Sequence, residues 1–240
     1  MIEPTILYED NEVLVINKPS GLVVHSDGKT EEKTLVDWLI EKYPQIKEVG
    51  EPGKTANGET ILRSGIVHRL DRETSGVMLV AKTQESFENL KNQFKDHEIK
   101  KIYQAFVLGE VKNDEDIIDR PISRSSKDFR RWTAQRGGRG EEREAVTEYK
   151  VLNRKDGFSL VEVYPKTGRT HQIRVHFKAI NYPLVSDRLY GRVVEDNLGF
   201  ERLALHSKQV TFRLTNGEER TVLAPYPEDF EKAVDILQSA

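Results

Sequence analysis

The sequence predicts an α+β fold around a mixed or antiparallel sheet. Short β-type runs recur along the chain, and few of them alternate with helices in the strict order that a parallel sheet requires. Of the 240 residues, 37% are hydrophobic and 32% are charged, so the chain can bury a sizeable core. No stretch has the composition of a linker, and we expect a single domain over residues 1–240.

The elements alternate between short strands and helices, separated by turn residues. In the first predicted helix, Leu35, Trp38 and Leu39 fall on one face, and Thr83 is a suitable N-cap for the second. In the first half we predict strands at 6–8, 13–17, 65–68 and 77–81, helices at 34–43 and 83–97, and a loop at 48–59. In the second half we predict strands at 101–108, 145–152, 158–164, 207–214 and 220–224, helices at 170–180 and 227–237, and a loop at 181–191.

Composition excludes several classes of protein. The sequence contains no cysteine, which removes disulfides, thiolate metal sites and cysteine nucleophiles. There is no run of about eighteen apolar residues to form a membrane-spanning helix. The N-terminus, Met1-Ile2-Glu3-Pro4, has neither the basic start nor the apolar core of a secretory signal. We therefore expect a cytoplasmic protein, and we expect it to be a monomer.

Positive charge is concentrated in the middle of the chain, although the formal net charge is -3. Residues 120–140 hold seven basic residues and one acid, whereas residues 1–60 hold twelve acids and six bases. Such a concentration is typical of a phosphate-binding surface, although a solvated basic loop would look the same. Trp132 adds a possible stacking surface for RNA. The residues that we expect to contact the RNA backbone are Arg124, Lys127, Arg130 and Arg131.

A polar turn between the predicted strands 65–68 and 77–81 contains the best candidate for a catalytic side chain. Asp71 lies between Arg69 and Arg72, and nearby cations favour an ionised carboxylate that can act as a nucleophile or base. For a lone aspartate, the alternative is a structural role in the turn.

The string His68-Arg69-Leu70-Asp71-Arg72-Glu73-Thr74-Ser75-Gly76 resembles the HRLDxxTSG signature of the RluA-type pseudouridine synthases. Four further segments resemble the other motifs of this family in the family's order, and the likeness extends from about residue 6 to residue 226. They are 17–25, 101–107, 165–176 and 205–207. The resemblance implies an α+β catalytic domain with a mainly antiparallel sheet, flanking helices and an RNA-binding cleft. It also implies that the chain isomerises uridines in structured RNA to pseudouridine.

The same resemblance assigns roles to individual residues. Asp71 is the catalytic carboxylate, Tyr103 stacks beneath the target base, and Arg174 pairs with Asp71. Ile173 forms one wall of the uracil pocket, and Arg69 enters the RNA stack where the uridine leaves it. The structural alternatives are core packing for Tyr103 and an ordinary exposed helix position for Arg174. The remaining residues that we expect at the substrate are Lys18, His68, Arg72, Thr74, Arg169 and His171.

No metal, nucleotide or redox cofactor is implied. His171 and His176 are five residues apart, which is not the spacing that places two metal ligands on one helical face. We interpret both as structural or as contacts to RNA. No room precedes residue 6 for the small S4 RNA-binding domain that some relatives carry, so we expect the catalytic domain itself to bind RNA.

The stretch 181–191 departs from the pattern G-x-P-L-x-G-D-x-x-Y-G that is common in the family. Asn181 and Ser186 replace the two glycines. If the backbone needs a positive φ at these positions, asparagine tolerates it better than serine does.

Ribosomal RNA and transfer RNA are both substrates within this family, and we favour ribosomal RNA. Two other functions remain open from the sequence. One is a catalytically inactive RNA-binding protein with the same fold. The other is a hydrolase that uses Asp71 with His68 or His171.

Overall fold

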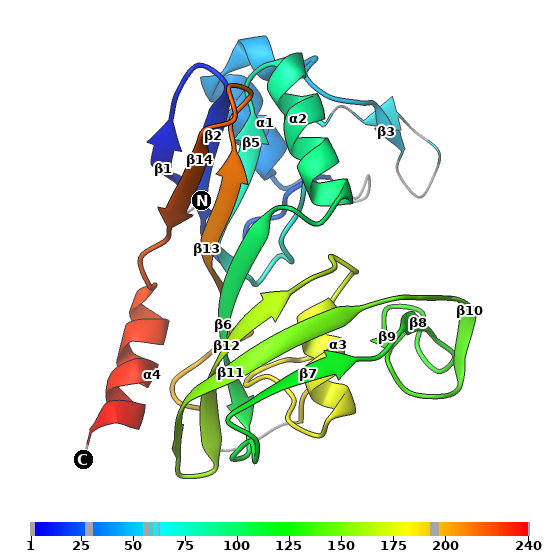
Figure 1. The fold of residues 1–240 in the computed structure, drawn as a ribbon, viewed down its shortest axis with the longest axis vertical. Coiled ribbons are helices and arrows are strands. Elements are labelled where there is room, and N and C mark those ends of the chain that lie inside the picture. Colours follow the sequence, from blue (N-terminus) through cyan, green and yellow to red (C-terminus); the bar gives the residue numbers. More distant parts are fainter. Residues whose placement is uncertain are drawn as a thin grey trace. The chain divides into compact units, whose positions relative to one another are not determined.

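The computed structural model describes residues 3–26, 31–54, 58, 60–61, 63–192 and 197–239. The chain divides into two compact units. Unit 1 comprises Met1–Lys100 and Ser207–Pro225, and unit 2 comprises Lys101–His206 and Tyr226–Ala240. Each unit combines β-strands with helices (Figure 1), which confirms the predicted α+β fold. A single domain over residues 1–240 stays a prediction.

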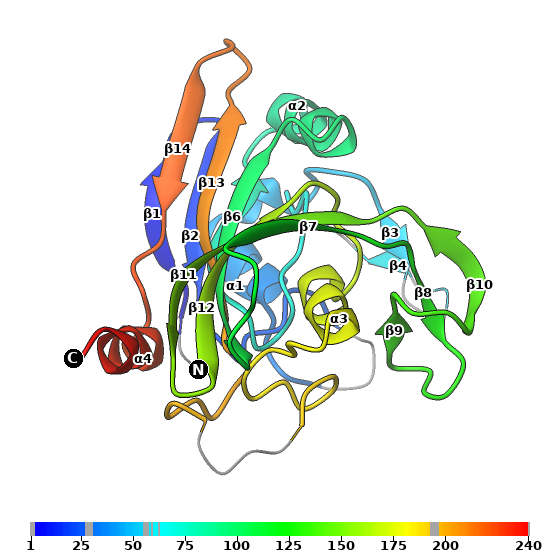
Figure 2. The same cartoon turned by 60° about the horizontal axis from the view of Figure 1, so that its bottom comes forward.

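Unit 1 is built on strands in the order β1-β2-β5-β13-β14, with two helices on one face of the sheet (Figure 2). Its central strand β5 is buried along its whole length, as expected of a strand covered on both faces. Thr34 and Thr83 each form a capping box at the start of a helix. The elements are β1 (Thr5–Glu9), β2 (Val13–Lys18), α1 (Leu35–Lys42), a 3-10 helix (Pro44–Ile46), β3 (Gly53–Lys54), β4 (Thr60–Ile61), β5 (Ser75–Ala81), α2 (Gln84–Lys95), β13 (Leu205–Arg213) and β14 (Glu219–Leu223).

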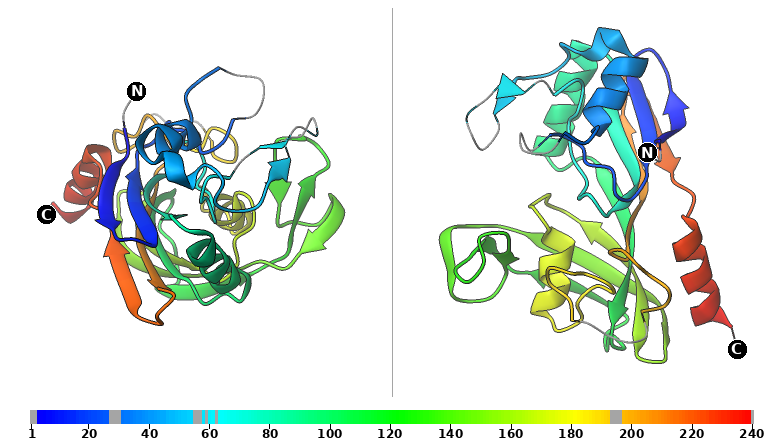
Figure 3. Two further views of the ribbon diagram at one scale, coloured as in Figure 1. Left: turned by 90° about the horizontal axis from the view of Figure 1, so that it is seen from above. Right: turned by 180° about the vertical axis from the view of Figure 1, so that it is seen from behind.

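In unit 2 the strands run in the order β6-β12-β11-β7, each antiparallel to the next. Alternate residues of β6 point to opposite faces. Ala105 and Val107 join the hydrophobic cluster that contains α3, whereas Phe106 and Leu108 join the cluster that contains α4. The sheet therefore lies between the two helices (Figure 3). These elements are β6 (Lys100–Leu108), β7 (Glu115–Asp119), β11 (Val146–Lys155), β12 (Phe158–Pro165), α3 (Gln172–Ala179) and α4 (Glu228–Gln238).

The basic segment forms a small sheet of its own within unit 2. The strands β8 (Ile122–Ser125), β9 (Trp132–Thr133) and β10 (Gly138–Arg143) pair antiparallel in the order β10-β8-β9. We call these three strands and the turns between them the basic sheet. The sequence did not predict these strands, because arginine, glycine and serine interrupt any apolar alternation here.

The prediction of a strand at 65–68 is wrong. The structure has only an isolated bridge between Ile66 and Val80, because Ser64 and Gly65 adopt φ values of 46° and 77°, which interrupt an extended chain. Strand β7 was missed because three of its five residues are acidic, which is unusual in strands. The other predicted strands and helices are confirmed to within a few residues. Residues 55–57 and 59 of the predicted loop lie outside the described residues.

No helix among the described residues is long and apolar enough to cross a membrane.

Candidate active site

The turn that carries Asp71 is anchored by a buried lysine. The side chain of Lys18 is fully buried, and its ammonium group donates hydrogen bonds to the carbonyl oxygens of Pro19, Leu22 and Arg72, at 2.9, 3.0 and 3.1 Å. The amide of Gly21 donates to the same Arg72 oxygen, at 2.9 Å. Lys18 thus joins the end of β2 to the residue after Asp71. Contact between Lys18 and substrate stays a prediction.

Two further hydrogen bonds hold the other side of the turn. The Ser20 hydroxyl donates to the carbonyl oxygen of Glu73, at 2.8 Å, and the Thr74 amide donates to the carbonyl oxygen of Asp71, at 3.1 Å. Asp71 itself is half-buried. Thr74 is 2% exposed, and its hydroxyl makes no hydrogen bond with any residue that the structure describes. A buried polar atom of this kind is uncommon and merits an explanation.

His68 supports the same turn from the side of the sheet. Its Nε2 atom accepts the amide hydrogen of Leu79, at 2.9 Å, so the proton of the neutral ring lies on Nδ1. The ring stacks on Phe94 of α2, with ring centroids 4.7 Å apart. These contacts fix the start of the motif relative to β5 and α2.

The two arginines that flank Asp71 are exposed. Arg72 makes a bidentate pair with Glu32, at 2.9 and 2.8 Å. Burial, followed by the positive charges of Arg69 and Arg63, lowers the pKa of His25 to about 4. Arg69 is therefore an exposed positive charge beside His25, as a contact to a phosphate backbone requires.

In unit 2, Tyr103 and Ile173 belong to one hydrophobic cluster. Tyr103 lies opposite Val163 in the pairing of β6 with β12 and packs, partly buried, against the cluster that contains Ile173. The sequence placed both side chains at the uracil. The structure brings them together within this unit.

Arg174 is not an ordinary exposed helix residue, because it is only 8% exposed. Its Nε and Nη2 atoms donate to Asp187, at 2.7 and 2.8 Å, and the Asp187 side chain is fully buried. The same carboxylate accepts the amide hydrogens of Leu189 and Tyr190, at 2.9 and 3.0 Å. Asp187 was not predicted from the sequence as a functional residue. Its signal was the D-x-x-Y-G part of the stretch 181–191.

Tyr190 is a second residue that the sequence analysis missed. Its hydroxyl accepts the Trp132 amide hydrogen at 2.9 Å and shares a hydrogen bond with Nδ1 of His171 at 2.8 Å. Its ring lies 5.0 Å from the Arg174 guanidinium. His171 is the residue before α3 and has a φ of 56°. The nearby Arg169 is exposed and donates from Nε to the carbonyl oxygen of Glu144, at 3.1 Å.

His176 is structural. It is fully buried, and its two ring nitrogens lie 2.9 Å from the Thr147 hydroxyl and 2.9 Å from the Arg120 carbonyl oxygen. Burial lowers its pKa, so the ring is neutral near pH 7.

The predicted contacts to the RNA backbone lie on the basic sheet. The Arg124 guanidinium covers the Trp132 ring at 4.3 Å, so the two side chains form one stacked pair instead of a bare indole face. Arg130 and Arg131 both lie within ion-pair distance of Asp128. Hydrogen bonds from Arg130 lower the pKa of Asp128 to about 2. Lys127 is exposed on the same turn.

The structure does use positive φ angles at the two positions where the family pattern has glycine. Asn181 has a φ of 70° and Ser186 a φ of 55°. The Ser186 hydroxyl donates to the carbonyl oxygen of Phe200, at 2.7 Å, which offsets part of the backbone strain.

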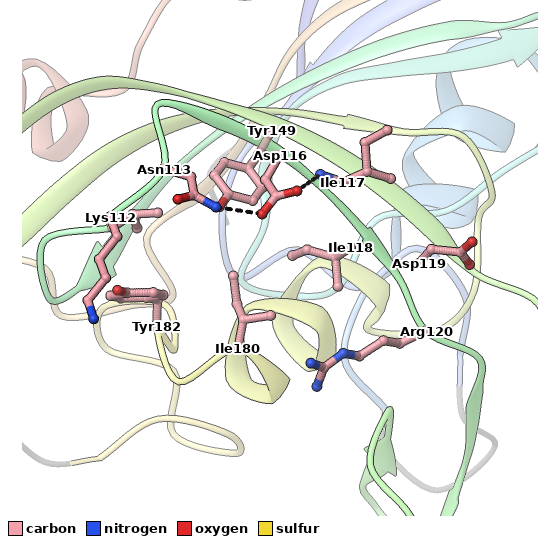
Figure 4. Close-up of a pocket in the computed structure, with 11 residues that line it drawn as sticks. Lys112, Asn113, Asp116, Ile117, Ile118, Asp119, Arg120, Tyr149, Ile180 and Tyr182 are labelled. Carbon is pink, nitrogen blue, oxygen red and sulfur yellow. Dashed lines mark hydrogen bonds between the residues drawn. The ribbon is translucent and has the colours of Figure 1, made fainter.

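A pocket of about 390 Å³ lies elsewhere in unit 2 (Figure 4). Residues 116–120 line one part of it, and Tyr149, Ile180 and Tyr182 line another. None of the predicted site residues contributes to it.

Comparisons with known proteins agree with the geometry. The sequence profile of the RNA pseudouridylate synthase family matches residues 12–179. Over 234 residues the chain is 39% identical to an uncharacterised RNA pseudouridine synthase of Bacillus subtilis, which covers 97% of this chain and 72% of that one. Over 239 residues it is 36% identical to ribosomal large subunit pseudouridine synthase D of Zymomonas mobilis, with the same two coverages, 97% and 72%.

Among solved structures, human RNA pseudouridylate synthase domain containing 1 superposes with a TM-score of 0.73 at 27% identity, covering 94% of this chain and 84% of that one. The chain therefore belongs to the RNA pseudouridylate synthase family, as an RluA-type enzyme of the isomerase class.

Proposed function

We propose that the chain converts uridines of large-subunit ribosomal RNA to pseudouridine, with Asp71 as the essential carboxylate. The observation that carries this proposal is the anchoring of the Asp71 turn. Hydrogen bonds to the carbonyl oxygens of Asp71, Arg72 and Glu73 fix the backbone that directly follows the carboxylate. A group held this firmly can be aimed at a reacting atom.

The substrate class rests on the relatives. A synthase 36% identical to this chain is described as acting on the large ribosomal subunit, and the 36% identity extends over 97% of the present chain. Transfer RNA is the alternative substrate, and the mapping experiment below distinguishes the two.

The reaction keeps every non-hydrogen atom of the nucleotide and exchanges one hydrogen with solvent. The N1–C1′ bond breaks, the uracil turns, a C5–C1′ bond forms, the C5 proton leaves and N1 gains a proton. Asp71 acts as a nucleophile in this scheme, at C1′ of the ribose or at C6 of the base, and the covalent bond that it forms breaks again before pseudouridine is released. The uridine must first leave its stack, which costs a few kcal/mol. Insertion of the planar Arg69 guanidinium into the gap would recover part of that cost.

Residues of unit 2 complete the proposed chemistry. Two of the five N–H donors of Arg174 bind Asp187, and in the proposal other donors of the same guanidinium hold Asp71 ionised. Tyr103 offers its ring face to the detached uracil, and Ile173 forms a wall of the pocket.

The remaining predicted residues take supporting or RNA-binding roles in the proposal. Lys18 and His68 hold the catalytic turn, and contact between the Thr74 hydroxyl and the substrate stays a prediction. The exposed or partly exposed groups that would contact RNA phosphates are Arg72, Arg169, His171, Arg124, Lys127, Arg130 and Arg131.

The test is pseudouridine mapping, by carbodiimide labelling and reverse transcription, on total RNA from cells with the gene, without it, and carrying only Asp71→Asn. We expect specific sites in large-subunit RNA to be lost in both the deletion and the variant. Asp156→Asn is the matched control, because Asp156 lies in a turn at a φ of 53° that asparagine tolerates. An unchanged map in the deletion strain contradicts the proposed substrate.

A further inference from the structure

Tyr190 joins three parts of unit 2 that the proposed reaction uses. Its hydroxyl binds the backbone of β9 in the basic sheet and the ring of His171, and its ring packs beside the guanidinium of Arg174. Tyr190 is 6% exposed. Figure 2 shows β9 beside α3, as these contacts require.

The bond to His171 acts on the start of α3. His171 precedes the helix in a left-handed conformation, with a φ of 56°, and no side chain caps the helix at this point. A left-handed non-glycine residue is strained and persists only where its surroundings hold it. The edge-on packing of the His171 and Tyr190 rings, with centroids 5.5 Å apart, adds to the hydrogen bond. Tyr190 therefore fixes the direction in which α3 begins.

The position of Arg174 depends on the same segment. Asp187 holds two guanidinium nitrogens and also accepts the amide hydrogens of Leu189 and Tyr190. Four hydrogen bonds converge on this buried carboxylate, so its position relative to Arg174, Leu189 and Tyr190 is closely fixed. A movement of Tyr190 would therefore move the carboxylate that aims Arg174.

The other end of the connection is the surface expected to bind RNA. Trp132, whose amide donates to Tyr190, pairs with Arg124 in the register of β8 with β9, and the Arg124 guanidinium stacks on the Trp132 ring. RNA phosphates that bind Arg124 or Arg131 would act on β9, and the Tyr190 hydroxyl links the β9 backbone to His171, the residue before α3.

We propose that Tyr190 is a positioning residue that couples RNA contact on the basic sheet to the orientation of Arg174. This inference rests on the proposed function, because it gives Arg174 a part in catalysis. Through this connection, binding of the correct RNA would orient the Arg174 guanidinium for catalysis. The role of the D-x-x-Y-G segment is then to hold Arg174 in that orientation.

The test compares Tyr190→Phe with wild-type protein in the release of tritium from large-subunit RNA that contains [5-³H]uridine. The change removes only the hydroxyl. We expect kcat to fall roughly tenfold or more, as a small misplacement of a catalytic group does, while KM changes less than about threefold and the melting temperature stays within a few degrees. Tyr164→Phe is the matched control, because it removes another hydroxyl of unit 2, one that donates to Glu162. It should leave kcat unchanged.

A double-mutant cycle on kcat with Arg131→Ala tests the coupling itself. In the wild-type background, loss of the basic contact should lower kcat; in the Tyr190→Phe background it should lower kcat much less, because the connection is already broken. Independent, multiplicative effects would overturn the coupling. An unchanged kcat in Tyr190→Phe would overturn the positioning role.

If Tyr190→Phe does not fold, His171→Asn removes the same hydrogen bond from its other end, since asparagine tolerates the positive φ. A wild-type kcat in this variant would overturn the inference. Failure of the wild-type protein to release tritium would contradict the proposed function instead, so the two failures are distinguishable.

Discussion

At the scale of single residues, charged and polar side chains are used as internal supports. The ammonium group of Lys18 donates hydrogen bonds to three carbonyl oxygens. The ring of His176 bridges a hydroxyl and a carbonyl in the core of unit 2. Such groups are costly to bury unless they are hydrogen-bonded. Lys18 and His176 both belong to family motifs, so some residues of these motifs support the fold and need not touch RNA.

His25 makes stability depend on pH. Its pKa is about 4 in the folded protein and about 6.5 when unfolded. Between these values the unfolded chain binds a proton that the folded chain does not, so the free energy of unfolding falls as pH drops below about 6.5. Lowering the pH from 7 to 5 should cost wild-type protein about 2 kcal/mol more than it costs His25→Gln.

Urea unfolding at the two pH values measures this difference. His97→Asn is the control, because His97 is exposed at a φ of 59° that asparagine tolerates; it should keep the wild-type pH dependence. Equal losses in wild type and His25→Gln would show that His25 is not held neutral by its surroundings.

At the scale of elements, the approach of β5 to β13 explains the glycine of the TSG motif. Gly76 has a φ of 111°, and a Cβ atom there would lie 2.1 Å from the carbonyl oxygen of Ser207. Gly21 also has a positive φ, of 88°, but a Cβ atom there meets nothing within 4 Å. An alanine at position 21 would therefore meet backbone strain alone, whereas an alanine at position 76 would meet both strain and a steric clash.

Gly76→Ala should lower the free energy of unfolding by about 4 kcal/mol or more, because strand backbone must move. Gly21→Ala should lower it by only about 1–2 kcal/mol, the cost of the left-handed conformation. Denaturant unfolding of both variants provides the comparison. Similar losses in the two variants would mean that β5 and β13 can separate easily.

Helices and long strands could be predicted from the sequence because their signals are local. Thr83 caps the helix that it was expected to cap, and the apolar run at 77–81 lies in the buried strand β5. The basic sheet could not be predicted this way, because pairing and the Arg124–Trp132 stack hold it together. The contacts of Arg174 with Asp187 and Tyr190 join positions 13 and 16 residues apart, so no local pattern revealed them.

At the scale of the whole molecule, the proposed residues are divided between the two units. Asp71 and its supporting residues belong to unit 1, whereas Tyr103, Arg174 and the basic sheet belong to unit 2. The charge is divided too, since residues 1–60 are acidic and residues 120–140 are basic. RNA binding through the basic sheet should therefore weaken steeply with salt.

In the proposed function, Asp71 is the carboxylate with which this chain isomerises uridine in large-subunit RNA. The most direct test is tritium release from unmodified large-subunit RNA labelled with [5-³H]uridine, by purified wild-type and Asp71→Asn proteins that bind the RNA equally well. We expect stoichiometric release by the wild-type protein and no release above the uncatalysed rate by the variant. Release by Asp71→Asn at the wild-type rate would contradict the proposed function.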